Sequence, residues 1–228
     1  MDLELTGRVA LVVGGRGYIG AAVADRLRAE GATVVVASRS AAGSEDGVAI
    51  DTADQASVDA GIARVMERHG RIDALVVTAA PSAGTLDPAK KSDPEQVLTA
   101  VDGKALGFLR VANAVLPVQR AAGFGRVVVV SGQNAYLSGN ITASLRNTAV
   151  SVIAKNLADE SAGTGVTVNV VNPGLVTDTP KAEVQRGGPG DSSPEQIAEL
   201  IAFLVSPRSV VSGESISIAH RVLGSITI

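Results

Sequence analysis

The chain has 228 residues and no cysteine, which excludes disulfides, thiolate metal sites and a cysteine nucleophile. Its net charge of −3 argues against the basic surface of a nucleic-acid-binding protein, and no apolar run reaches the roughly 18 residues of a membrane span. The first residues also lack a signal-peptide pattern, so we expect a cytoplasmic protein with no nucleic-acid and no membrane partner.

Short apolar runs alternate with helix-like stretches along the whole chain. The runs are rich in β-branched residues, which suits strands buried on both faces of a parallel sheet. The predicted strands are Val9–Val13, Thr33–Ala37, Leu75–Val77, Val127–Val130, Val166–Val171 and Ser215–Ile218. The predicted helices are Ile19–Glu30, Gln55–Arg68, Glu95–Arg120, Ile141–Ala162 and Pro194–Val205.

Start and stop signals agree with these helices. Gly31 follows the first helix as a C-terminal cap, Asp54 precedes the second as an N-cap, and Ser193 and Pro194 open the last. The alternation of strands and helices, without a linker or repeat, predicts one Rossmann-like, doubly wound α/β domain over residues 1–228.

The first predicted strand runs directly into a glycine-rich segment. It contains the G-x-G-x-x-G pattern as Gly15, Gly17 and Gly20. Glycine permits the tight turn, lets the backbone approach a pyrophosphate and lets the following helix pack closely, with its free N–H groups toward the phosphates. Because the pattern lies between a strand and a helix, we interpret it as a dinucleotide-binding loop rather than a merely glycine-rich turn.

The residues after the second predicted strand indicate which dinucleotide is bound. A ribose with a free 2′-hydroxyl usually meets an acidic side chain here, whereas a 2′-phosphate meets Arg and hydroxyl groups. Ser38 and Arg39 stand at this point, and no carboxylate lies between Gly31 and Ser44. With Arg16 they predict NADP(H) rather than NAD(H). The alternative is that Arg39 is a solvated surface cation.

With these residues, the chain resembles the short-chain dehydrogenase/reductase family over essentially its whole length. Ala49–Thr52 resembles the segment whose Asp contacts the adenine, and Asp73–Ala80 stands where the family has D-x-L-V-N-N-A-G. Lys155–Glu160 matches the end of the helix that normally carries the catalytic pair. Val168–Gly174 is very similar to the N-x-x-x-P-G stretch along the nicotinamide.

The resemblance implies a sheet of about seven parallel strands with three helices on each face. It also implies a small-molecule substrate, no metal, and assembly into homodimers or homotetramers. Together with the glycine loop and the Ser38–Arg39 pair, it gives these expected cofactor-binding residues: Gly14, Gly15, Arg16, Gly17, Tyr18, Ile19, Gly20, Ser38, Arg39, Asp51, Thr52, Ala79, Ala80, Pro173, Gly174 and Thr177.

The catalytic residues of that family are not found at their expected positions. The family uses Asn, Ser, Tyr and Lys, the last two spaced as Y-x-x-x-K. Counting from the matched segments places these positions on Asp102, Gly132, Ala143 and Asn147, and no Y-x-x-x-K occurs in the chain. Methyl and amide groups cannot transfer a proton at neutral pH, so we expect the usual alcohol–ketone interconversion to be slow or absent.

Four nearby residues are candidate catalytic substitutes: Tyr136, Asp102, Ser131 and Asn147. Tyr136 follows the predicted strand Val127–Val130 at the carboxyl edge of the sheet, where it could supply a proton or plug a small pocket. Asp102 could act as an acid or base if burial raised its pKa, although a helix or water-network role is commoner. Ser131 is a hydroxyl near the lost Ser position, with a capping role as the alternative.

Neighbouring residues are weighed in the same way. Asn147 and Arg146 are candidate hydrogen-bond partners of the ribose or substrate, with a surface position as the alternative for Arg146. Lys104 is interpreted as a helix cation. Ser144 is a hydroxyl near the lost Ser and Tyr positions, with a capping role as the alternative. His220 could reach a neighbouring subunit or the pocket, and a structural role is favoured for it.

Three functions remain open at this point. The first is an NADPH-dependent reductase of a carbonyl, conjugated enone or iminium with an altered proton source. The second is a non-redox reaction such as elimination, cyclisation or isomerisation. The third is a cofactor-binding pseudoenzyme.

Overall fold

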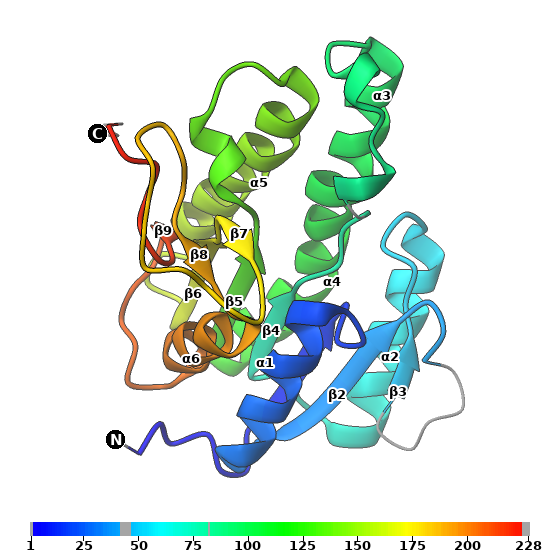
Figure 1. Cartoon of the computed structure of the whole chain (residues 1–228). Helices are drawn as coiled ribbons and strands as arrows, with labels where there is room; N and C mark the ends of the chain where they lie inside the picture. The colour runs from blue at the N-terminus through cyan, green and yellow to red at the C-terminus, as the bar shows by residue number, and fades with distance from the viewer. Residues whose placement is uncertain (1, 42–46, 82, 225–228) are drawn as a thin grey trace.

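The computed structural model describes residues 2–41, 47–81 and 83–224, and a seven-stranded parallel sheet forms its centre (Figure 1). The strand order is β3-β2-β1-β4-β5-β6-β9, so the direction of winding reverses between β1 and β4. This confirms the predicted doubly wound α/β fold. The strands are β1 (Val9–Val13), β2 (Thr33–Ser38), β3 (Gly47–Ala49), β4 (Ala74–Val77), β5 (Gly125–Val130), β6 (Val166–Asn172) and β9 (Ser215–Ser217).

Helices cover both faces of this sheet, but unequally (Figure 1). The six α-helices are α1 (Tyr18–Ala29), α2 (Gln55–His69), α3 (Pro94–Val101), α4 (Gly107–Ala122), α5 (Ile141–Glu160) and α6 (Pro194–Val205). Helices α2, α4 and α5 pack on one face, whereas only α1 and α6 cover the other within the described residues, so the expected three on each face is wrong. In the described part of the chain, no helix is long and apolar enough to cross a bilayer.

The core explains why the strands are continuously apolar. In β1, Val9, Leu11 and Val13 enter the cluster under α2, α4 and α5, whereas Ala10 and Val12 enter the cluster under α1 and α6. Successive side chains of a strand point to opposite faces, and here both faces are covered. Strands β1 and β4 therefore need apolar residues at every position, which is the pattern that the sequence carries.

The predicted caps are confirmed. The Asp54 side chain accepts a hydrogen bond from the Ala56 N–H at 3.0 Å. Ser193 and Gln196 form a reciprocal capping box at the start of α6. Gly31 follows α1 with φ of 84°, a conformation that favours glycine.

Three features were not predicted. Strand β3 has only three residues, too few for a periodic signal. The helix expected over Glu95–Arg120 is interrupted by a π-helical turn at Asp102–Leu106, and this turn changes which residues face the sheet. A separate two-stranded sheet, β7 (Leu175–Val176) with β8 (Asp191–Ser192), lies after β6.

Candidate active site

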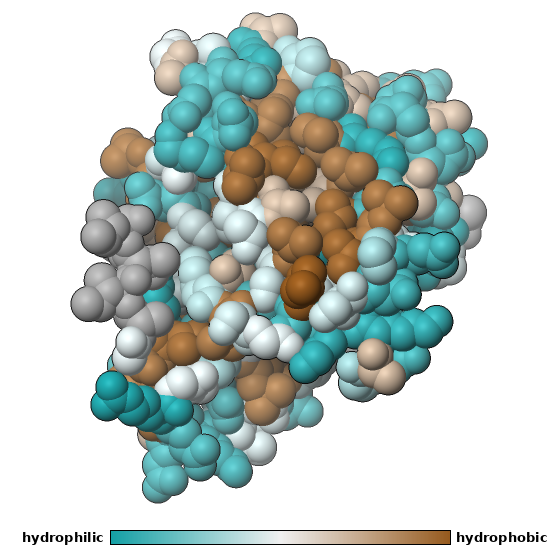
Figure 2. Space-filling view, turned by 90° about the horizontal axis from the view of Figure 1, so that it is seen from above, coloured by the Kyte–Doolittle hydropathy of each residue, from teal (hydrophilic) through white to brown (hydrophobic). Residues whose placement is uncertain are grey.

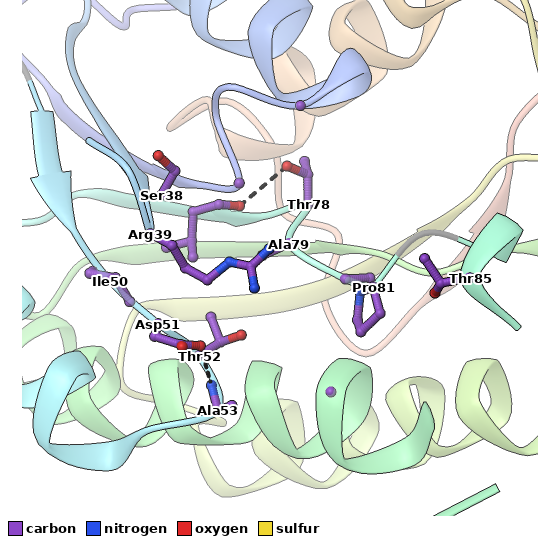
Figure 3. Close-up of a pocket in the computed structure, with 15 residues that line it drawn as sticks. Ser38, Arg39, Ile50, Asp51, Thr52, Ala53, Thr78, Ala79, Pro81 and Thr85 are labelled. Atoms are coloured by element: carbon purple, nitrogen blue, oxygen red, sulfur yellow. Dashed lines mark hydrogen bonds between the residues drawn. The ribbon is translucent and has the colours of Figure 1, made fainter. Parts of the chain in front are cut away.

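A cavity of about 600 Å³ opens at the carboxyl ends of the first four strands, beside the point where the winding reverses. Loops after β1, β2, β3 and β4 form its walls, and Gly103 of the π-turn contributes from across the sheet (Figure 3). From above, weakly polar and apolar side chains gather toward the middle of the molecule, and hydrophilic ones lie mainly around the rim (Figure 2). The cavity is lined by Val13, Gly14, Gly17, Ser38, Arg39, Ile50, Asp51, Thr52, Ala53, Thr78, Ala79, Ala80, Pro81, Thr85 and Gly103.

The glycine loop can take its shape only with glycine at two positions. Gly14 has φ of 87°, and a Cβ there would lie 2.6 Å from the Ala79 nitrogen. A Cβ on Gly20 would overlap the carbonyl oxygen of Gly14. Gly17 lies between them as the N-cap of α1, with no side chain to cap the helix. The first N–H groups of α1 are therefore open to an anionic ligand.

The end of β2 and the residue after it carry a hydroxyl and a cation that no described residue pairs with. Ser38 Oγ is buried and has no hydrogen-bond partner among the described residues, although an unpaired buried hydroxyl is costly. Arg39 is exposed, and its side chain extends over the cavity (Figure 3) without a hydrogen bond or ion pair to the described residues. Arg16 turns toward this loop, where Nη1 donates to the Ser40 carbonyl at 2.6 Å. These groups fit a phosphorylated ribose.

The far wall of the cavity comes from the loops after β3 and β4. Asp51 Oδ1 accepts a hydrogen bond from the Ala53 N–H at 3.0 Å, and the Asp51 N–H donates to Ser57 Oγ at 2.9 Å. Thr52 lies beside Asp51, and Ala79 lies opposite (Figure 3). Ala80 also lines the cavity. These expected cofactor contacts thus lie together in one cavity.

Other expected cofactor residues lie around the cavity rather than in its lining. Gly15, Arg16, Ile19 and Gly20 belong to the loop and the first turn of α1. Tyr18 is half exposed, and its hydroxyl donates to Asp178, which raises the pKa of Tyr18 to about 12. This bond joins the glycine loop to the segment that follows β7.

The residues expected along the nicotinamide follow β6. Pro173 accepts a hydrogen bond from the Gln133 N–H at 2.9 Å, and Thr177 donates its N–H to the Ser192 carbonyl at 3.0 Å. Gly174 lies so close to Gly190 that a side chain would overlap its carbonyl oxygen. These contacts hold the segment at the carboxyl edge of the sheet, outside the lining of the cavity.

Three elements meet near the end of β5, at residues to which counting along the sequence assigned catalytic positions. Asn147 on α5 is buried, and its Nδ2 donates to the Ala143 carbonyl at 2.8 Å. Ser131, at the end of β5, donates its hydroxyl to the Asn147 carbonyl at 3.0 Å. A Cβ built on Gly132 would lie 3.3 Å from Asn147 Oδ1. Gly132, Ala143 and Asn147 are therefore neighbours in space.

The structure adds a residue that the sequence argument set aside. Lys104 is only 6% exposed, and its Nζ donates to Asn147 Oδ1 at 2.7 Å and to the Ser131 carbonyl at 2.9 Å. Burial, together with the charge of Arg146, lowers the pKa of Lys104 to about 7. Its interpretation as a helix cation is wrong, because the π-turn directs it inward.

Arg146 is buried as well, so the surface position considered for it is wrong. Its Nη1 has no hydrogen-bond partner among the described residues, and burial lowers its pKa. For Lys104, one signal in the sequence could have indicated a place in the site: it lies two residues after Asp102, the position assigned to the catalytic Asn.

Two catalytic candidates make other contacts. Asp102 forms an ion pair with Arg110 at 2.7 Å. The Tyr136 hydroxyl accepts from Asn172 Nδ2 at 3.1 Å and lies 3.1 Å from Ser215 Oγ, so it is tied to β6 and β9. Neither residue lines the cavity.

The remaining side chains of this region have local partners. Ser144 donates its hydroxyl to the Leu137 carbonyl at 2.5 Å, and the exposed His220 lies with Nδ1 2.6 Å from the Arg221 carbonyl. The N-cap of α5 is Asn140, so the capping role considered for Ser144 is wrong, and the contact of His220 is a local one.

Comparison with known proteins places this geometry in context. Residues 15–219 match the family profile described as enoyl-(acyl carrier protein) reductase. An uncharacterized oxidoreductase of Staphylococcus haemolyticus is 33% identical over 94% of this chain and 98% of its own length. A 3-oxoacyl-[acyl-carrier-protein] reductase of Vibrio cholerae is 28% identical, with 95% of this chain and 97% of that protein covered.

A solved structure has the same fold. The crystal structure of levodione reductase superimposes with a TM-score of 0.82 and 23% sequence identity, covering 95% of this chain and 97% of that one. The seven-stranded sheet and its flanking helices are thus a known architecture.

Proposed function

Because the chain belongs to the short-chain dehydrogenase/reductase family and its relatives are oxidoreductases, we propose that it is an NADP(H)-dependent reductase with a non-standard proton source. Its substrate in this proposal is a small metabolite that carries a carbonyl, a conjugated enone or an iminium. The proposal has two parts, the cofactor and the altered site.

The cofactor part rests on one observation. The buried Ser38 hydroxyl has no hydrogen-bond partner in the described part of the chain, and Arg39 extends beside it over the cavity. A 2′-phosphate supplies acceptors for both groups, whereas an NAD ribose would leave the guanidinium unpaired. We therefore assign Ser38 and Arg39, with Arg16 nearby, to the phosphate that distinguishes NADP from NAD.

The other cofactor contacts follow from the same cradle. The N–H groups at the start of α1 bind the pyrophosphate, and the residues after β3 hold the adenine end. Pro173, Gly174 and Thr177 are assigned to the nicotinamide end. When bound, the cofactor supplies the hydride, while the chain orients the substrate and excludes water.

The second part of the proposal, the altered catalytic site, is supported by the residues around Asn147. Gly132 has no side chain, Ala143 has only a methyl group, and an amide cannot exchange protons at neutral pH. A hydroxyl-based proton donor is therefore absent where the family has one. A carbonyl substrate must then receive its proton from another group. A conjugated enone or an iminium demands less of a protein acid at the hydride step.

The test is a binding and turnover experiment with purified protein. NADPH and NADH are titrated by fluorescence, and NADPH consumption is followed with acetoacetyl-CoA, a cyclic diketone, a conjugated enone and a cyclic imine. Tight NADPH binding with turnover of at least one compound is expected. Binding without turnover would indicate a pseudoenzyme, and product without a change in cofactor absorbance would indicate a non-redox reaction.

A further inference from the structure

Lys104 is an unusual residue for the place that it occupies. Its side chain is buried between the π-turn, the end of β5 and helix α5, yet it has no carboxylate partner among the described residues. Burying an ammonium without a counter-charge is costly, so such a residue requires an explanation. Its two hydrogen bonds go to neutral oxygens, on Ser131 and Asn147.

The charged groups around Lys104 leave it poised between two protonation states. Arg146 on α5 is the charged group that acts on it, and a second buried cation disfavours the ammonium. Asp102 and Arg110 pair with each other, as do Lys155 and Asp159 further along α5. Glu95, on α3, is exposed at the start of its helix.

An ammonium group has three N–H donors, and only two of those on Lys104 are used. The third has no acceptor among the residues that the structure describes. Asn147 Oδ1, which receives one of the used bonds, lies 3.3 Å from where a Cβ of Gly132 would be. A Cβ on Gly132 would therefore crowd the same oxygen that Lys104 contacts.

On the basis of the proposed function, we propose that the Lys104 ammonium is the proton source of this active site and that Asn147 positions it. Asn147 stands where the family has its lysine, and Lys104 reaches the same point from the opposite helix. In this arrangement α5 carries the amide, on Asn147, and the π-turn carries the amine, on Lys104. Ser131 fixes the pair through its carbonyl and hydroxyl.

The proton step balances without another reactant. With hydride supplied to the carbonyl carbon from the nicotinamide cofactor, the C=O π bond breaks and C–H and O–H bonds form. The Nζ–H bond of Lys104 breaks as the substrate oxygen gains its proton, directly or through one water. The neutral amine then regains a proton from solvent.

The pKa of Lys104, about 7, suits this role. General acids work best when their pKa lies near the operating pH. Only the ammonium can donate, so the turnover number should fall as the pH rises through about 7.

The test combines three variants with a spectroscopic readout. Lys104→Met removes the amine at similar length, and Lys104→Arg keeps a charge that cannot release its proton near neutral pH. Lys155→Met is the matched control, because Lys155 is exposed and bonds only to Asp159 within the described residues. Lysine ε-carbons labelled with ¹³C are titrated by NMR in the NADPH complex. The chain has only these lysines: Lys90, Lys91, Lys104, Lys155 and Lys181.

One lysine signal should titrate near pH 7 and disappear in Lys104→Met. NADPH turnover with the best ketone should fall about 100-fold or more in Lys104→Met and Lys104→Arg, with NADPH affinity retained, and stay unchanged in Lys155→Met. If Lys104→Met does not fold, the wild-type titration, Lys104→Arg and the pH profile carry the test.

Two results would overturn the role of Lys104 alone: an ordinary pKa for this lysine, or turnover in Lys104→Met with the wild-type pH profile. NADPH binding without turnover of any ketone by the wild type would instead overturn the proposed reductase, and this role with it. The two failures are therefore distinguishable.

Discussion

Arg39 is the residue on which the choice of cofactor depends. We expect Arg39→Asp to weaken NADPH binding by at least about tenfold, because a charge-assisted pair is lost and a like charge faces the phosphate. NADH binding should change little or improve. Fluorescence titration of both nucleotides measures this, with Arg64→Asp on the exposed face of α2 as the control. Equal weakening of both nucleotides would remove the assignment of Arg39.

Gly20 is the residue on which the shape of the glycine loop depends. Alanine favours a helix by about 1 kcal/mol over glycine, but its Cβ would overlap the Gly14 carbonyl. Since backbone must move, we expect Gly20→Ala to cost about 1–3 kcal/mol of unfolding free energy and to weaken NADPH binding. Urea denaturation checks the first effect. Gly17→Ala, whose Cβ would lie 3.2 Å from the same oxygen, should cost less; an equal or greater loss there would contradict this explanation.

At the scale of elements, helix α6 is held at its start by a reciprocal cap. Ser193 Oγ accepts from the Gln196 N–H at 3.2 Å, and the Ser193 N–H donates to Gln196 Oε1 at 3.0 Å. We expect Ser193→Ala to lower the unfolding free energy by about 1 kcal/mol, measured by urea denaturation. Ser193→Asp keeps an acceptor and should lose less. An alanine variant as stable as the wild type would show that Pro194 alone sets this end.

The π-turn is the element that distinguishes this site. It lies between α3 and α4 and places Gly103 at the cavity while Lys104 enters the protein interior. A regular helix of the same sequence would rotate these side chains differently, because each residue advances about 100° around the axis. The turn therefore sets the meeting of Lys104 with Asn147.

At the scale of the whole molecule, Asp73 joins the first strand to the fourth. Its carboxylate accepts from the Val9 N–H at 2.9 Å and from Arg8 Nη1 at 3.1 Å, and it also pairs with Arg71. Burial opposes its ionisation, but the bonds from Arg71, Val9 and Arg8 outweigh burial and hold the pKa of Asp73 below its usual value.

A lowered carboxyl pKa adds stability that is fully present above the unfolded value, about 3.8, and is lost as the pH falls through the folded value. We expect Asp73→Asn to lower the unfolding free energy by about 1–3 kcal/mol at pH 7. The difference from the wild type should shrink from pH 7 toward pH 3. Urea denaturation across this range measures it, and a difference independent of pH would show that the charge of Asp73 contributes nothing.

The expected assembly into homodimers or homotetramers also belongs to this scale, and it stays a prediction. The roles of the cofactor and catalytic residues likewise await the experiments above.

The sequence by itself determined six strands of the seven-stranded sheet, most of the helix bounds, their caps and the glycine loop. These features depend on side chains within a few residues of one another, as Ser193 and Gln196 show at α6. Gly14–Gly20 and the Ser38–Arg39 pair were predictable for the same reason, because each lies directly after its own strand.

The tertiary structure alone decided that Lys104 meets Asn147. Lys104 and Asn147 are 43 residues apart in the chain and belong to different elements. Their contact depends on the phase of an unpredicted π-turn and on how two helices pack, and neither leaves a local pattern in the sequence. Burial then fixes the chemistry, because removal from water gives an ordinary lysine a pKa of about 7.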